Sequence, residues 1–183
     1  ARSERALEAV PPEDRYQYAA VSWCFRRIRE AGGLGIFCHP SWISGGRYDV
    51  PSALTDLIYA LQPYDALELI GGYQLFEAES NVHQVARWAE ERAAGRRIPV
   101  VGVSDAHGCF NGRLFGWYYT IAFAPSPAWR DVLPAIRDEW SVAVEARPGE
   151  VPRAFGPYRL VLFAHFLMRE LLPRHDELCA EEG

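Results

Sequence analysis

Residue types that bind metal ions follow short apolar runs at two places in the chain. Asp105 and His107 come directly after the valine-rich run 98–103, and His39 comes directly after the run 34–38. Carboxylate oxygens and imidazole nitrogens are ligands for divalent zinc, manganese or iron. Because a single histidine at a strand end is more often structural, the prediction depends on all three converging. We expect His39, Asp105 and His107 to hold a metal ion.

A further carboxylate interrupts an apolar segment. Glu68 lies in the middle of residues 66–70, which otherwise read as a buried strand. Burying a carboxylate is costly unless it is paired or coordinated. The residue types leave three roles open: a metal ligand, an acceptor for the ring N–H of a ligand histidine, or an ion pair with an arginine. We favour the acceptor role, in the second coordination shell of the metal.

Two arginines and two cysteines lie near the candidate ligands in the sequence. Arg47 and Arg113 fall in loops expected to border the same edge, where a guanidinium could bind a phosphate through two hydrogen bonds; a solvent-facing role is equally expected. Cys38 and Cys109 are interpreted as packed thiols. The remaining histidines, at positions 83, 165 and 175, accompany helical patterns and are interpreted as structural.

A competing motif overlaps the same loop. Residues 102–106 nearly match the G-x-S-x-G turn of serine hydrolases, with Ser104 as the nucleophile. That motif requires a strand, a sharp turn and then a helix. Gly108, Asn111 and Gly112 follow within a few residues, which does not favour a helix start. A serine hydrolase using Ser104 is therefore the weaker alternative.

The elements that must position these residues alternate between strand and helix. Strands are predicted at 34–38, 66–70, 98–103, 117–123 and 141–146, and helices at 13–31, 52–62, 80–94, 127–139 and 157–172. The inward faces are predicted to hold Val21, Phe25 and Ile28, then Leu54, Leu57, Ile58 and Leu61, then Val82, Val85, Ala86 and Ala89. Ser80 is expected to cap the third helix. The first three strands recur about every 30 residues, which indicates parallel βα units with a site at their carboxyl ends.

Three segments together resemble a known family. They are G-L-G-I-F-C-H-P (33–40), A-L-E-L-I-G (66–71) and V-G-V-S-D-A-H-G (101–108). They look like the second half of a PHP (polymerase and histidinol phosphatase) domain, and more narrowly like its metal-dependent phosphoesterases, over about residues 33–124. The resemblance implies part of a distorted (β/α)7 barrel with a metal cluster at its rim. It matches His39, Asp105 and His107 to metal ligands and Glu68 to a recurrent strand glutamate.

The chain departs from the family at its start. PHP domains open with an H-x-H strand, and no H-x-H is present in these 183 residues. Since the chain begins at Ala1, we expect the missing ligands to lie upstream; a degenerate member is the alternative. The expected organisation is a linker or loop at 1–12, the C-terminal part of a PHP-like α/β barrel at 13–146, and a helical extension at 147–183.

Composition limits the partners. The net charge is −5, and all 19 basic residues are arginine, so no basic surface for nucleic acid and no lysine chemistry is expected. The four cysteines show no C-x-x-C spacing, and no signal peptide or membrane span is predicted, which favours a cytoplasmic protein. A small phosphorylated substrate or nucleotide is the expected ligand. The apolar 157–172 helix is a candidate oligomer contact, or the docking face of a non-catalytic PHP-like binding module.

Overall fold

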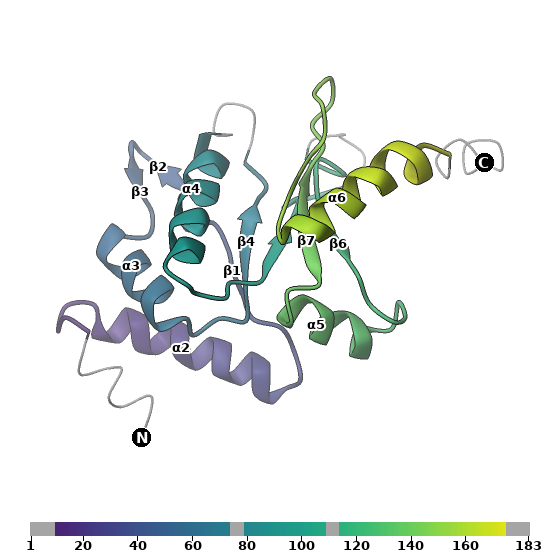
Figure 1. The fold of residues 1–183 in the computed structure, drawn as a ribbon. Coiled ribbons are helices and arrows are strands. Elements are labelled where there is room, and N and C mark those ends of the chain that lie inside the picture. Colours follow the sequence, from purple (N-terminus) through teal and green to yellow (C-terminus); the bar gives the residue numbers. More distant parts are fainter. Residues whose placement is uncertain (1–9, 74–78, 109–113, 175–183) are drawn as a thin grey trace.

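The computed structural model describes residues 10–73, 79–108 and 114–174 (Figure 1). Cys109, Arg113 and His175, and most of the predicted 1–12 linker, lie outside the described residues. The helices are α2 (Arg15–Glu30), α3 (Ser52–Leu61), α4 (Glu79–Ala93), α5 (Trp129–Arg137) and α6 (Tyr158–Phe166), which continues into a wider π-helical turn, η2 (Leu167–Leu171). The strands are β1 (Ile36–Phe37), β2 (Ile43–Ser44), β3 (Arg47–Tyr48), β4 (Ala66–Ile70), β5 (Val100–Gly102), β6 (Tyr118–Ala122), β7 (Ser141–Glu145) and β8 (Arg153–Phe155).

Strands β1, β4 and β5 form a parallel sheet in that order, so the predicted parallel βα units are confirmed. Helix α3 connects β1 to β4, and α4 connects β4 to β5. In Figure 1 the two helices lie on the same side of β4. All five residues of β4 are buried, as expected for the central strand of a covered parallel sheet. This arrangement brings the carboxyl ends of three strands to one edge.

A second sheet follows, and it is antiparallel. Its order is β6-β7-β8, and β8 lies within the segment 147–183 that was predicted as a helical extension. That prediction was wrong at β8 because residues 153–155 pair with the fully buried β7. The sheet meets β5 through side chains: the Ser141 hydroxyl donates to Val100 O at 2.7 Å, and the Thr120 hydroxyl both donates to and accepts from the Gly102 backbone.

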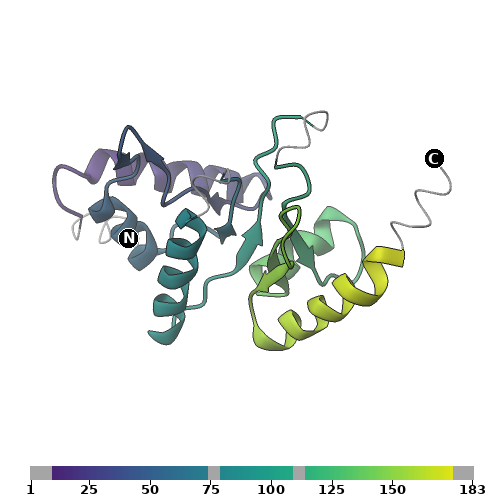
Figure 2. The ribbon, with the colours of Figure 1, turned by 90° about the horizontal axis from the view of Figure 1, so that it is seen from above.

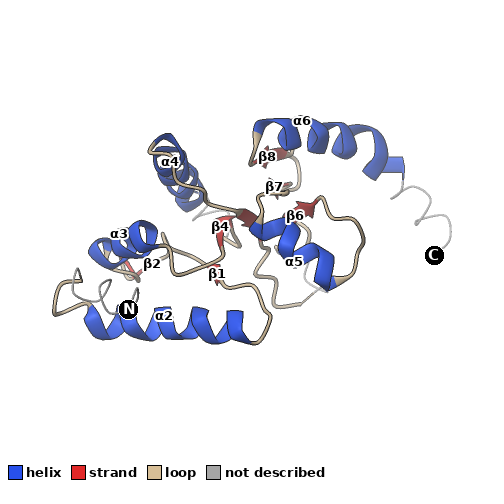
Figure 3. Cartoon of the chain, turned by 60° about the horizontal axis from the view of Figure 1, so that its bottom comes forward, coloured by secondary structure: helices blue, strands red, loops and turns tan. Residues whose placement is uncertain are grey.

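The two sheets do not close into a barrel in the described part of the chain. Figure 3 shows β1 and β4 with α2, α3 and α4 on one side and the antiparallel sheet with α5 and α6 on the other. The fold is mixed α/β, with one parallel and one antiparallel three-stranded sheet. A two-stranded hairpin, β2–β3, occupies the loop predicted after His39.

Helix α2 begins two residues later than predicted and buries less of the expected stripe. Phe25 is buried, but Ile28 is exposed. The helix is instead joined to the sheet by a polar contact, because Arg29 donates to the buried carboxylate of Asp65 at 2.9 Å. Asp65 also accepts from the backbone N–H of Gly35, just before β1. The amphipathic pattern therefore located the helix but overestimated its apolar contact.

Helix α4 turns mainly polar residues to the sheet, which corrects most of the predicted inward face; of its four residues, Val85 alone packs against the core. Val82 is 62% exposed and Ala86 and Ala89 are exposed, whereas Asn81 and Gln84 are buried. The Gln84 amide donates to Glu68 O and Leu69 O, both at 3.1 Å, and Asn81 Oδ1 accepts from Gly71 N. These bonds satisfy backbone groups of the chain around β4 that packing alone would leave unpaired. Ser80 does not act as the predicted cap, since it lies inside the helix and donates to Ser41 O.

Helix α6 lies along the antiparallel sheet and keeps much of its apolar surface outside. Ala164 is fully buried, while Leu162, Phe163 and Phe166 are about half exposed. Figure 2 shows α6 on the side of the molecule opposite α2. None of the helices in the described residues has the length and hydropathy needed to span a bilayer.

Candidate metal centre

Two of the predicted ligands meet at the carboxyl edge of the parallel sheet. His39 follows β1 and Asp105 follows β5, and His39 Nε2 lies 3.9 Å from Asp105 Oδ2. Both residues have left-handed backbones, with φ of 52° and 53°. Such conformations cost on the order of 1–3 kcal/mol each for residues other than glycine, and they concentrate at functional sites. The strained turns aim two ligand-type side chains at one another.

Glu68 lies next to His39 on the neighbouring strand. Its side chain is 0% exposed, and its Oε1 lies 3.1 Å from His39 Nδ1. The other oxygen, Oε2, accepts the backbone N–H of His39 at 3.2 Å. The Nδ1–Oε1 contact has ion-pair distance without good hydrogen-bond geometry, so both atoms lack a hydrogen-bond partner among the described residues. The contact with Glu68 raises the pKa of His39, and burial of the imidazole opposes the rise.

Consecutive glycines make room for both carboxylates. A Cβ added at Gly71 would overlap Glu68 Oε1, and a Cβ at Gly72 would overlap the Asp105 Cβ and the Ser104 carbonyl. Any side chain at either position would therefore displace a candidate site residue. In the sequence this pair is only a glycine break after the apolar run 66–70. In the structure, the Glu68 carboxylate packs against Gly71 and the Asp105 side chain packs against Gly72.

Two aromatic rings frame the imidazole. The Trp42 ring lies 5.5 Å from the His39 ring and stacks on Tyr73, also at 5.5 Å. Tyr73 is fully buried and donates to Gln84 Oε1 at 2.6 Å, which fixes it to α4. The sequence gave no signal for these neighbours, because they come from separate loops. Together they restrict how far the His39 ring can rotate.

The Cys38 thiol shares this environment. The residue as a whole is exposed, but Sγ turns back toward Ile36 O at 3.6 Å. Burial of the thiol, and then the neighbouring Glu68 carboxylate, raise the pKa of Cys38 to about 12. The thiol is therefore held protonated at neutral pH and is unsuited to nucleophilic or thiolate-ligand chemistry.

Of the other predicted site residues, the two that are described, His107 and Arg47, make no hydrogen bond or ion pair with this group. His107 is exposed and makes no hydrogen bond or ion pair with a described residue. Arg47 is exposed on β3 and likewise has no described ion-pair partner. Arg113 falls outside the described residues. Arg47 therefore makes no hydrogen bond or ion pair with His39, Glu68 or Asp105 in the described part of the chain.

The donor set fits a metal in part. Two atoms bound to one ion at about 2.1 Å each are at most about 4.2 Å apart, so the 3.9 Å between His39 Nε2 and Asp105 Oδ2 permits a shared ion. Within residues 10–73, 79–108 and 114–174, however, no three His, Cys, Asp or Glu side chains are arranged to hold a metal together. His39 and Asp105 could supply two ligands, and Glu68 faces the far side of the imidazole.

Ser104 has a structural role in the turn. Its hydroxyl accepts the backbone N–H of Ala106 at 3.3 Å, and no helix begins within residues 103–108. A nucleophile elbow needs a helix directly after the serine. The local geometry therefore gives the serine-hydrolase alternative no support.

Searches of known protein families, curated proteins and solved structures find no match for this chain. The link to the PHP family therefore remains a resemblance in three short segments. The chain's function is therefore inferred from the geometry of the site.

Proposed function

We propose that this chain contributes to a metal-dependent phosphoesterase, with His39 and Asp105 as metal ligands. The observation that supports this most is the meeting of the two side chains across a parallel sheet, each on a strained backbone, 3.9 Å apart. Packing alone gives no reason to strain two polar residues toward each other. Strain at a ligand pair is what a pre-organised metal site needs.

In this proposal Glu68 positions His39. A proton on Nδ1 directed toward the buried Glu68 carboxylate leaves the lone pair of Nε2 directed toward Asp105. A carboxylate behind a ligand histidine fixes the ring and makes it a stronger donor. Gly71 and Gly72 keep Glu68 and Asp105 in place, and Trp42 limits the ring's rotation.

The substrate in this proposal is a small phosphate mono- or diester, including a nucleotide. A divalent zinc, manganese or iron ion supplies a water of lowered pKa and neutralises charge on the phosphoryl oxygens. His107, exposed two residues after Asp105, is available as a further ligand or a substrate contact. Arg47 and Arg113 remain candidates for binding the phosphate.

Metal titration tests the ligand pair directly. Chelator-treated protein is titrated with Zn²⁺ and with Mn²⁺ by calorimetry, alongside His39→Gln and Asp105→Asn. We expect each substitution to weaken binding at least about tenfold, because each removes one of few ligands. His165→Gln and Asp138→Asn are matched controls in the second half of the chain and should bind like wild type. Equal binding by wild type and Asp105→Asn would place the ion elsewhere and refute the proposal.

Hydrolysis is measured on the same proteins. Wild type with added metal is assayed on bis(p-nitrophenyl) phosphate and on p-nitrophenyl phosphate. The proposal expects metal-dependent turnover that Asp105→Asn abolishes and Asp138→Asn retains. Turnover that persists in Asp105→Asn or in chelator contradicts it.

A non-catalytic binding module is the second candidate, and α6 is the feature that favours it. Leu162, Phe163 and Phe166 are about half exposed on one helix, more apolar surface than a helix facing only water usually carries. This candidate expects no metal-dependent turnover. It also expects self-association in sedimentation velocity that Leu162→Glu with Phe166→Glu removes.

A further inference from the structure

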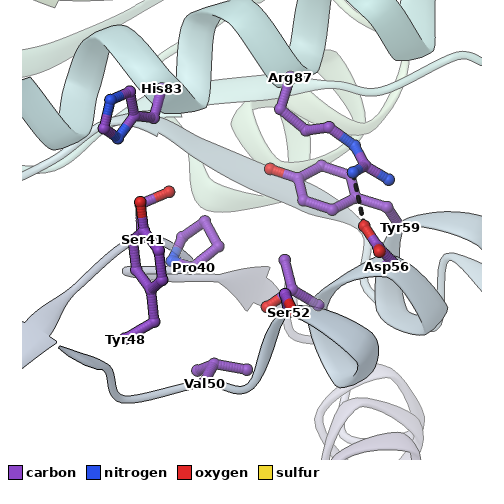
Figure 4. A pocket seen from close by; sticks show the side chains of 10 residues that line it. Pro40, Ser41, Tyr48, Val50, Ser52, Asp56, Tyr59, His83 and Arg87 are labelled. Carbon is purple, nitrogen blue, oxygen red and sulfur yellow. Dashed lines mark hydrogen bonds and ion pairs between the residues drawn. The ribbon is translucent and has the colours of Figure 1, made fainter.

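An open pocket of about 180 Å³, with both apolar and hydroxyl-bearing side chains in its wall, lies between the hairpin after β1, helix α3 and helix α4. Figure 4 shows Tyr59 and Asp56 from α3 facing His83 and Arg87 from α4, with Tyr48 of the hairpin closing one side. Its wall includes Pro40, which directly follows His39, but none of His39, Glu68 or Asp105. The cavity is thus next to the candidate metal centre and separate from it.

Two hydroxyl groups in the lining have no hydrogen-bond partner among the described residues. Tyr59 is 1% exposed, and neither its hydroxyl nor that of Thr55 makes a hydrogen bond with any described residue. In Figure 4 the Tyr59 hydroxyl points toward the space between His83 and Asp56. Burial raises the pKa of Tyr59, so its hydroxyl remains a neutral donor and acceptor. A buried hydroxyl without a partner is costly, and a ligand that bonds to it removes that cost.

The charges in the cavity do not favour an anion. Arg87 donates to Asp56 Oδ1 at 2.5 Å and to Glu91 Oε1 at 2.8 Å, and its guanidinium lies over the Tyr59 ring at 4.9 Å. Two carboxylates and an aromatic face already take up its charge. A phosphate would have to compete with both carboxylates, so the fitting ligand is neutral.

Size and chemistry narrow the ligand further. A cavity of about 150 Å³ accommodates one benzene ring, so about 180 Å³ accommodates one six-membered ring and not a nucleotide. The lining is rich in hydroxyls, from Ser41, Tyr48, Ser52, Thr55 and Tyr59. Hydroxyls both donate and accept, which suits a ligand whose own groups do the same. We propose that this cavity binds a neutral monosaccharide ring.

The test uses the whole chain and free sugars. Amide spectra of the ¹⁵N-labelled protein are recorded during titration with D-ribose, D-glucose, D-galactose and, as a ring without hydroxyls, adenine. We expect at least one sugar to bind with a Kd in the millimolar range, because so small a ligand offers few contacts. Shifts should concentrate on α3, α4 and the hairpin. Tyr59→Phe, which removes only the hydroxyl, should weaken binding about 3- to 10-fold.

Tyr64→Phe is the matched control. Tyr64 is also buried with a hydroxyl lacking a described partner, but it does not line the cavity. Its removal should leave the Kd unchanged, as should Asp105→Asn, so failure of the metal proposal is distinguishable from failure of this one. The proposal is overturned if adenine binds and no sugar does, if no sugar binds the folded protein, or if Tyr59→Phe binds like wild type.

Discussion

Glu68 is the residue on which the candidate ligands depend most closely. It is a fully buried carboxylate that contacts His39 through both a backbone N–H and the imidazole. Glycine at position 71 leaves the space that the Glu68 carboxylate occupies.

Gly71→Ala should destabilise the protein and weaken metal binding. The added Cβ overlaps the Glu68 carboxylate, which must then move away from His39. Inserting a methyl group into such a packed position costs about 1–3 kcal/mol, measured as the free energy of unfolding in urea. Gly108→Ala is the control, because a Cβ there meets nothing within 4 Å. Equal stability of the two variants would show that Glu68 is not fixed where the structure has it.

In metal-free protein, the His39–Glu68 contact should make stability depend on pH. The contact with Glu68 raises the pKa of His39 above its usual 6.5 in the folded state. A raised folded pKa adds stability that is fully present below the unfolded value and is lost as pH rises through the folded one. The stability difference between wild type and His39→Gln should therefore be larger at about pH 5.5 than at about pH 8.5. Urea unfolding measures it, and Glu68→Gln should reduce the trend; a trend of opposite sign contradicts the contact.

Cys38 should react slowly with iodoacetamide at about pH 8, since only the thiolate is nucleophilic. Burial, and then the Glu68 carboxylate, raise the pKa of Cys38 to about 12, which leaves very little thiolate. The exposed Cys24 on α2 is the internal reference and should be alkylated at least about tenfold faster. Peptide-resolved mass spectrometry separates the cysteines. Equal rates at Cys38 and Cys24 would mean that the Cys38 thiol is not desolvated.

At the scale of elements, α4 is the helix whose orientation the amphipathic pattern predicted wrongly. Its buried polar residues bond to backbone groups of β4 and the turn after it, while Val82 faces outward. Burying the apolar stripe of α4 would have stabilised the fold less than these hydrogen bonds do, so the polar residues face the sheet. The same bonds hold Tyr73, and through its ring Trp42, beside His39.

Gln84→Ala should therefore destabilise the protein more than Val82→Ala. The substitution leaves Glu68 O and Leu69 O without the amide donor and opens a gap under α4. The expected loss is about 1–3 kcal/mol, against less than about 0.5 kcal/mol at the exposed Val82. Urea unfolding compares them. A larger loss of unfolding free energy for Val82→Ala would instead support the helix orientation predicted from the sequence.

At the scale of the whole molecule, the two sheets are coupled through the backbone at Gly102. A Cβ at this position would overlap Tyr119 O, and the Thr120 hydroxyl bonds to both Gly102 N and Gly102 O. Gly102→Ala should lower stability by about 1–3 kcal/mol and reduce amide hydrogen-exchange protection in both sheets together. Loss confined to one sheet would show that the sheets open independently.

The sequence by itself determined the local features. The ten predicted strands and helices all form within a few residues of their predicted bounds. The spacing of apolar residues and the glycine or proline breaks are local signals, so they can be read from short stretches of sequence. The parallel βα units followed from strand spacing, and so did the placement of His39 and Asp105 at one edge. For Glu68 the sequence left three roles open and favoured an acceptor for a ligand histidine; the structure places its carboxylate 3.1 Å from His39 Nδ1, and the link to a metal stays a prediction.

Only the tertiary structure decided which side chains meet. His107 is two residues from Asp105 and yet is exposed, with no hydrogen bond or ion pair to a described residue. The antiparallel pairing of β8 with β7, the inward polar face of α4 and the cavity around Tyr59 each join residues distant in sequence. Such contacts depend on how elements pack and on which backbone groups need partners. Periodicity along one element carries no information about either.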